Sequence, residues 1–191
     1  MKATIWLVRH GETEWSLSGR HTGRTDVPLT ATGRQQAEAL GRRLDRRPFA
    51  LVLTSPLLRA RETCRLAGYG DAAVSTGDLV EWDYGRYEGR TTDEVRAERP
   101  GWSIFQNGVE GGETIDEVAT RSRRVIERAA AVTGGDVLLF AHGHVLRVVA
   151  ATWLGLPPDA GRLFALRTAT LSILGYERET RVLSVWNIEA A

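Results

Sequence analysis

The sequence predicts an α/β fold, a three-layer α/β/α sandwich with a mostly parallel central sheet. Apolar runs typical of strands alternate along the chain with segments of helical periodicity, and capping residues or glycine pairs mark several boundaries between them. The strand-like runs cover residues 3–8, 51–53, 137–141, 171–176 and 182–188. The first three are apolar almost throughout, as expected of strands that helices cover on both faces.

Two helices are predicted in the first third of the chain. Thr30 can cap a helix whose apolar positions recur at spacings of three and four, namely Ala37, Leu40 and Leu44. Ser55-Pro56 resembles an N-cap followed by proline at the first helical position, which predicts a helix through residues 59–66.

Two more helices flank the most apolar strand. Thr114 and Glu117 have the spacing of a capping box, and Gly134-Gly135 ends the helix that this box begins. After the strand, another helix is expected to run from His142 towards Trp153.

Length and composition predict one domain over residues 1–191 in the cytoplasm. Hydrophobic residues make up 42% of the chain and charged residues 26%, and the net charge is +1. Nothing in this charge predicts binding to nucleic acid or an anionic membrane, and no leader or membrane-spanning run is apparent. Cys64 is alone and is expected to pack as a small hydrophobe. The last two strands and Trp186 could form a homodimer interface or complete the sheet.

Two histidine motifs each follow a predicted strand. Residues 9–12 read Arg-His-Gly-Glu, and residues 142–144 read His-Gly-His. Ligands of open α/β sheets bind at the carboxyl ends of strands, which is where these motifs fall. His10 can attack phosphorus if a backbone carbonyl holds its other nitrogen as a donor. Arg9 and Arg59 can bind phosphate oxygens, and backbone N–H groups after His142 could do so too.

A leaving alcohol also needs a proton, and the acidic loop 79–85 can supply one. Glu81 is the strongest candidate, with Asp83 and Glu88 as competitors that spacing alone does not eliminate. His21 is expected to lie at the surface. The aromatic residues of this region, Trp82, Tyr84 and Trp102, could instead cover a pocket.

These motifs, taken in order, resemble the histidine phosphatase superfamily, which has the phosphoglycerate-mutase-like fold. The match begins with residues 7–13 and continues through Gly33, 55–63, Glu81 with 87–89, 112–114 and 141–143. The resemblance implies that His10 is phosphorylated, that Arg9, Arg59 and His142 hold the phosphate, and that Glu81 is the proton donor. It also implies a substrate pocket lined by Ser16, Thr22, Gly23, Tyr84, Gly143 and His144. The family uses no metal or organic cofactor.

Finer matches are similar to the sedoheptulose-bisphosphatase-like and bacterial acid phosphatase branch. They predict a metal-independent phosphatase that acts on a small phosphorylated metabolite, such as a sugar phosphate, through a phosphohistidine. Ser16 departs from the asparagine common in the family, and residues 82–112 lack the longer basic insertion usual in cofactor-dependent mutases. Three alternatives stay open: such a phosphoglycerate mutase, a protein phosphohistidine phosphatase, and a non-catalytic sensor of a phosphate ligand.

Overall fold

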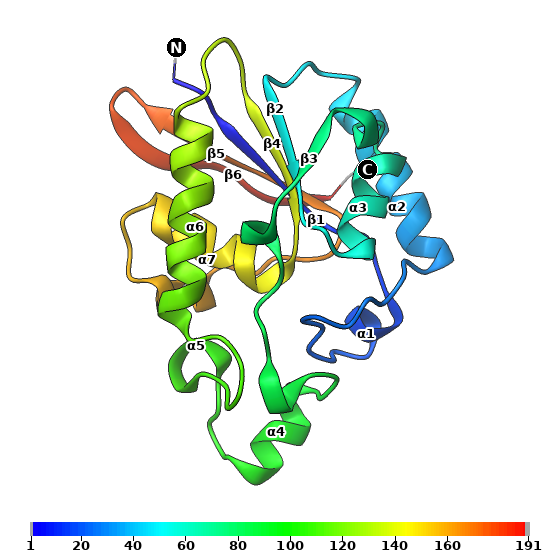
Figure 1. The fold of residues 1–191 in the computed structure, drawn as a ribbon, viewed down its shortest axis with the longest axis vertical. Coiled ribbons are helices and arrows are strands. Elements are labelled where there is room, and N and C mark those ends of the chain that lie inside the picture. Colours follow the sequence, from blue (N-terminus) through cyan, green and yellow to red (C-terminus); the bar gives the residue numbers. More distant parts are fainter. Residues whose placement is uncertain (1, 190–191) are drawn as a thin grey trace.

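A six-stranded sheet organises the computed structural model, which describes residues 2–189 (Figure 1). The strand order is β3-β2-β4-β1-β5-β6. The first four strands in this order run parallel, whereas β5 is antiparallel to β1 and β6 is antiparallel to β5. The bounds are Ile5–Arg9 for β1, Leu51–Thr54 for β2, Ala73–Ser75 for β3, Val137–Ala141 for β4, Thr170–Glu177 for β5 and Thr180–Glu189 for β6. The predicted α/β fold with a mostly parallel sheet is confirmed.

Helices cover both faces of the sheet (Figure 1). The longer helices are α2 (Ala31–Leu44), α3 (Leu58–Leu66), α6 (Ile115–Ala130) and α7 (Gly143–Trp153). Three short ones, α1 (Glu14–Leu17), α4 (Thr92–Glu98) and α5 (Ile104–Asn107), lie beyond the end of the sheet. No helix within residues 2–189 is both long enough and apolar enough to cross a membrane.

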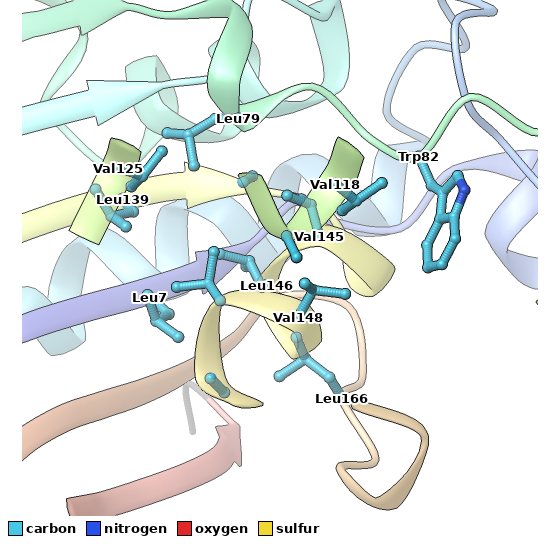
Figure 2. Packing of buried hydrophobic residues seen from close by; sticks show 14 of the residues in the cluster. Leu7, Leu79, Trp82, Val118, Val125, Leu139, Val145, Leu146, Val148 and Leu166 are labelled. Carbon is cyan, nitrogen blue, oxygen red and sulfur yellow. The ribbon is translucent and has the colours of Figure 1, made fainter. Parts of the chain in front are cut away.

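Two apolar cores form because successive side chains of a strand point to opposite faces. Leu7 of β1 and Leu139 of β4 belong to the core beneath α6 and α7, where Val145 and Val148 of α7 meet them (Figure 2). Their neighbours Val8 and Phe140 belong to the other core, which packs against α2 and α3. Strands buried on both faces explain the apolar runs seen in the sequence.

The predicted helix starts hold at three positions and fail at one, and the helix expected after His142 begins at Gly143. The Thr30 hydroxyl accepts a hydrogen bond from Gly33 N at 2.9 Å, and Thr114 forms the expected capping box with Glu117. The prediction that Ser55-Pro56 opens a helix is wrong, since α3 begins at Leu58. The Ser55 hydroxyl lies 2.8 Å from His142 Nε2 and does not cap the helix.

The C-terminal strands complete the sheet. β5 pairs with β1, with Val8 opposite Leu171, and β6 pairs with β5. The Trp186 indole donates to Ala165 O and packs against Phe164, so this side chain holds the preceding loop. Of the two roles considered for these strands, completing the sheet is the one observed.

Residues 78–114 cross from the sheet to the short helices α4 and α5 and back, and Arg121 of α6 holds both ends of this segment. Its side chain is 6% exposed and pairs with Glu113 at 2.9 Å. The same guanidinium donates to the carbonyl oxygens of Asp78 (3.0 Å) and Val80 (2.6 Å). One buried cation therefore links the two ends of this segment, residues 78 and 80 at its start and Glu113 at its end.

Replacing Arg121 by Met is expected to lower the free energy of unfolding by about 3–5 kcal/mol, because the Glu113 carboxylate loses its buried partner. Urea denaturation measures the change. Arg86→Met is the matched control, since Arg86 forms an exposed pair with Glu110, and its midpoint should stay close to that of the wild type. An Arg121→Met midpoint as high as the control's would contradict the anchoring role.

Candidate active site

The pairing of β1 with β4 brings the two histidine motifs together. The strands are parallel and in register, with Arg9 opposite Ala141. The ladder extends one step further, because His10 N donates to Ala141 O at 3.0 Å. His10 and His142 are the next residues in this register, and their ring centroids lie 5.2 Å apart.

Successive side chains of β1 point to opposite faces of the sheet, so Arg9 and His10 face different sides. His10 follows Val8 in facing the α3 side, where Arg59 and Ser55 lie. Arg9 follows Leu7 in facing α7. A Cβ atom at Gly143 would lie 3.2 Å from Arg9 Cζ, so glycine allows the guanidinium to lie close against the start of α7.

One nitrogen of the His10 ring is free for nucleophilic attack. Its Nδ1 lies 2.7 Å from Gly11 O, and because a carbonyl oxygen only accepts, Nδ1 carries the proton and Nε2 keeps its lone pair. Gly11 therefore supplies the backbone carbonyl that the sequence led us to expect. Burial, reinforced by the charges of Arg59 and Arg9, holds the pKa of His10 well below its usual value. The ring is neutral at neutral pH.

Three buried nitrogens around His10 lack hydrogen-bond partners within residues 2–189: Arg9 Nε, Arg59 Nε and His142 Nδ1. Buried polar groups are almost always paired, so three unpaired ones in one place indicate a polar ligand. His142 Nε2 is already bound to the Ser55 hydroxyl, which leaves Nδ1 as the nitrogen free for a ligand.

Arg59 has a second role in building the site. Its Nη2 donates to Thr22 O (2.8 Å) and Gly23 O (3.1 Å), and its Nη1 donates to Thr25 O (3.1 Å). Three carbonyl oxygens of one loop thus converge on a guanidinium that is fully buried. This loop forms one wall of the site.

Glu81 is held at the N-terminus of α7. Its carboxylate accepts hydrogen bonds from the backbone N–H groups of Trp82 (2.9 Å), His144 (3.0 Å) and Val145 (2.9 Å). The sequence predicted that N–H groups following His142 could meet a phosphate. Two of them are instead occupied by Glu81, whose negative charge suits the positive end of the helix.

The two competing carboxylates are used elsewhere. Asp83 accepts from Gly85 N (3.0 Å), and Glu88 accepts from Gly23 N (2.9 Å) and Thr25 N (3.1 Å). A Cβ atom at Gly23 would lie 2.7 Å from the backbone oxygen of Trp82, so this close approach needs glycine. Glu88 therefore fixes the loop that Arg59 also holds.

A cavity of about 200 Å³ brings most of the predicted residues together. It is lined by eight of them: Arg9, His10, Ser16, Thr22, Glu81, Tyr84, Gly143 and His144. Arg59, Gly23 and His142 are not part of its lining. Arg59 and His142 are fully buried beside it and reach it through their contacts with Thr22 and His10.

Ser16 and Tyr84 differ in what they offer a ligand. The Ser16 hydroxyl accepts from Thr13 N (2.9 Å) and donates to Thr13 O (2.8 Å), so it is committed to the start of α1. Tyr84 OH lies 2.6 Å from His144 Nδ1, and both side chains line the cavity. Of the three aromatic residues left open, only Tyr84 lines the cavity, since Trp82 and Trp102 are buried behind it.

The expectation that His21 lies at the surface is wrong. The ring is 7% exposed, stacks on Tyr84 with centroids 4.8 Å apart and lines the cavity. Burial lowers the pKa of His21 to about 4. Its partner lies 63 residues away in the sequence, so no local pattern could have shown this contact.

The lining also includes residues that sequence reasoning missed. Arg147 is the most informative, and a signal for it existed, because it follows His144 by three positions and shares its helix face. Arg20 and Thr92 gave no such signal. Within residues 2–189, no group of three or more His, Cys, Asp or Glu side chains is arranged to hold a metal ion. Cys64 is packed as predicted, and burial raises its pKa to about 12.

Known proteins similar to this chain are phosphatases and mutases. The family model of the histidine phosphatase superfamily (branch 1) matches residues 5–189. An acid phosphatase from Mycobacterium tuberculosis is 43% identical over 184 residues, which cover 95% of this chain and 90% of that one. Sedoheptulose 1,7-bisphosphatase from Saccharomyces cerevisiae is 39% identical, over 78% of this chain and 67% of that one. A protein from Yersinia enterocolitica named as a probable phosphoglycerate mutase is 34% identical, over 98% and 91%.

The fold has a solved counterpart. The structure of an open reading frame product from Mycobacterium tuberculosis superimposes with a TM-score of 0.95 at 40% identity, and the match covers 100% of both chains. The arrangement of strands and helices described above is therefore that of a known, phosphoglycerate-mutase-like architecture.

Three of the four histidines are buried and His144 is partly buried, and burial lowers the pKa of each below the usual 6.5. They are neutral when folded but take up protons below pH 6.5 when unfolded. The stability they contribute is thus present above pH 6.5 and is lost as pH falls. For His21 this window runs from 6.5 to about 4. We expect His21→Phe to reduce the slope of unfolding free energy against pH by about 1.2 kcal/mol per unit between pH 6 and 5. Urea titrations at several pH values measure the slope, and an unchanged slope would contradict the neutral ring.

Proposed function

The chain belongs to the histidine phosphatase superfamily, branch 1, and is a phosphoric monoester hydrolase; on that premise, we propose that it hydrolyses small phosphomonoesters, such as sugar phosphates, through a phosphohistidine and without a metal ion. The observation that carries this proposal is the neutral His10 ring, whose Nδ1 is held by Gly11 O and whose Nε2 is free. A nitrogen with a free lone pair, beside unpaired donors for phosphate oxygens, is suited to attack phosphorus.

In the first step, His10 Nε2 attacks phosphorus in line with the leaving oxygen. The N–P bond forms while the P–O bond to the alcohol breaks, and Glu81 in its protonated form gives its proton to the leaving oxygen. Arg9, Arg59 and His142 stabilise the phosphoryl oxygens through the nitrogens that lack partners in the structure. The alcohol leaves neutral, and the phosphoryl group stays on His10.

In the second step, water replaces His10 on phosphorus. Glu81, now ionised, takes a proton from the water as its oxygen attacks, and the N–P bond breaks to return the neutral ring. Inorganic phosphate departs, and Glu81 is again protonated for the next cycle. One carboxyl group can serve both steps because it borders the same cavity as His10.

The cavity favours a small phosphorylated metabolite as the ligand, since about 200 Å³ leaves little room for a folded protein partner. The acid phosphatase and sedoheptulose-bisphosphatase relatives support the same choice. We propose that residues 1–191 act as a single domain in this reaction.

A phosphoglycerate mutase is the second candidate, and the relative named as a probable mutase favours it. A mutase must keep the phosphohistidine from water and hold a bisphosphate. The arginines of residues 82–112 are engaged outside the cavity. Arg86 and Arg90 pair with Glu110 and Glu98, Arg96 donates to Trp102 O, and Arg99 donates to Tyr87 OH. This segment therefore adds no cation to the cavity, unlike the basic insertion expected of a cofactor-dependent mutase, which favours the phosphatase.

His10→Ala is expected to reduce phosphate release by at least about 10⁴-fold, because it removes the ring nitrogen that attacks phosphorus. The assay follows phosphate release with EDTA present from sedoheptulose 1,7-bisphosphate, fructose 1,6-bisphosphate, 3-phosphoglycerate and p-nitrophenyl phosphate. Wild-type protein quenched during turnover should carry acid-labile phosphate, and His10→Asn, which keeps a polar side chain, should carry none. Near-normal release from His10→Ala would refute the mechanism. Dependence on a bisphosphate primer would support the mutase.

Glu81→Gln should discriminate between leaving groups. We expect kcat/KM to fall by about 10²- to 10⁴-fold for sugar phosphates, whose alkoxides need a proton, and by much less for p-nitrophenyl phosphate. The ratio kcat/KM reports only steps up to release of the alcohol, so it separates the acid role from the later base role. Equal losses for both substrates would argue against Glu81 as the acid.

A further inference from the structure

Arginines inside the protein differ in whether they have a negative partner. Five arginines within residues 2–189 are buried or partly buried: Arg9, Arg59, Arg90, Arg121 and Arg147. Arg90 pairs with Glu98 and Arg121 with Glu113. The other three form no ion pair with a carboxylate among the described residues, and burial lowers the pKa of each. A buried cation is costly unless it is paired. The charge of Glu81 acts on all three of these arginines, but one carboxylate cannot balance three guanidiniums, so they need a further anion.

Arg9 and Arg59 already have one, since they flank His10 and meet the phosphoryl group that is transferred. Arg147 remains. It lies on α7 one turn beyond His144 and lines the same cavity as His10. When the transferred phosphate has paired with Arg9 and Arg59, Arg147 in the cavity wall still has no anionic partner.

The Arg147 side chain is held in a fixed orientation. Its Nε donates to Gly161 O at 2.9 Å, its Nη2 donates to Arg162 O at 3.1 Å, and its guanidinium stacks 4.6 Å from the centroid of the Phe105 ring. Nη1 has no hydrogen bond to any described residue. These contacts account for two nitrogens of the side chain and leave a positive charge and a donor for a ligand.

The histidines beside Arg147 do not supply this charge. Burial, with Arg147 itself as the next contribution, holds the pKa of His144 well below its usual value, and burial also lowers that of His21. Both rings are neutral near neutral pH. The positive charge at this wall therefore comes from a group that stays protonated, and Arg147 is that group.

We propose that Arg147 is a specificity-determining residue that binds a second anionic group of the substrate. The preferred substrates are then phosphomonoesters that carry a further phosphate or carboxylate. The planar guanidinium matches either group. This inference rests on the proposed phosphomonoesterase function and narrows its substrate class.

Two matched substrate pairs test the proposal. 3-Phosphoglycerate and glycerol 3-phosphate differ in a carboxylate, and fructose 1,6-bisphosphate and fructose 6-phosphate differ in a phosphate. The readout is the ratio of kcat/KM within each pair. We expect wild-type protein to favour the doubly anionic member and Arg147→Gln to lose about 10- to 100-fold of that preference, the usual cost of a lost hydrogen bond to a charged group.

Arg162→Gln is the matched control, because it removes the same charge from a neighbouring exposed side chain that pairs with Asp159. Its ratios should equal those of the wild type. Arg147→Lys keeps the charge without the planar fork and should retain part of the preference, which also covers the case that Arg147→Gln fails to fold.

Each outcome decides a different point. Preference in one pair alone identifies the second group as carboxylate or phosphate. Hydrolysis of p-nitrophenyl phosphate with equal ratios in wild type and Arg147→Gln would overturn the role of Arg147 and leave the phosphatase intact. Absence of hydrolysis for every compound would overturn both.

Discussion

The in-register pairing of β1 with β4 is the constraint on which the site depends. Because Arg9 lies opposite Ala141, the residue that follows each strand is a histidine, and the two rings meet at the sheet's carboxyl edge. A slip of one residue would send His10 to the other face, away from Arg59. Apolar side chains on both faces of the two strands prevent such a slip. The hydrophobic cores therefore set the positions of the proposed catalytic groups.

The sequence predicts the parts of the molecule that local patterns encode. Long strands, capped helices and the two histidine motifs were recognised because periodicity and spacing reveal them. The short helices α4 and α5 were missed, since seven and four residues are too few to show a period. The burial of His21 and the free charge of Arg147 were also missed. The first depends on Tyr84, which is distant in the chain. The second arises because the hydrogen bonds of Arg147 go to the backbone carbonyls of residues 161 and 162 instead of a carboxylate, which helix spacing does not reveal.

The histidines and the arginines of the site differ in charge. Burial keeps the imidazoles neutral, whereas the guanidiniums stay charged because arginine holds its proton even when buried. Neutral rings are suited to attack and to hydrogen bonding, and charged forks are suited to binding oxyanions. The carboxylate of Glu81 occupies the end of α7, so the helix holds the acid and the arginines are left for the substrate.

The position of β5 has a consequence for how the chain is made. β5 pairs with β1, and the loop before it contacts the proposed nucleophile and its neighbour, because Ala169 N donates to His10 O and Leu166 O accepts from Arg9. A ribosome releases the N-terminal residues first, so the motif at residues 9–12 emerges long before the segment that fixes it. Once residue 147 has emerged, the nascent chain holds the side chains proposed to act in catalysis but lacks the contacts that fix Arg9 and His10. We expect activity to begin only when the C-terminal strands are in place.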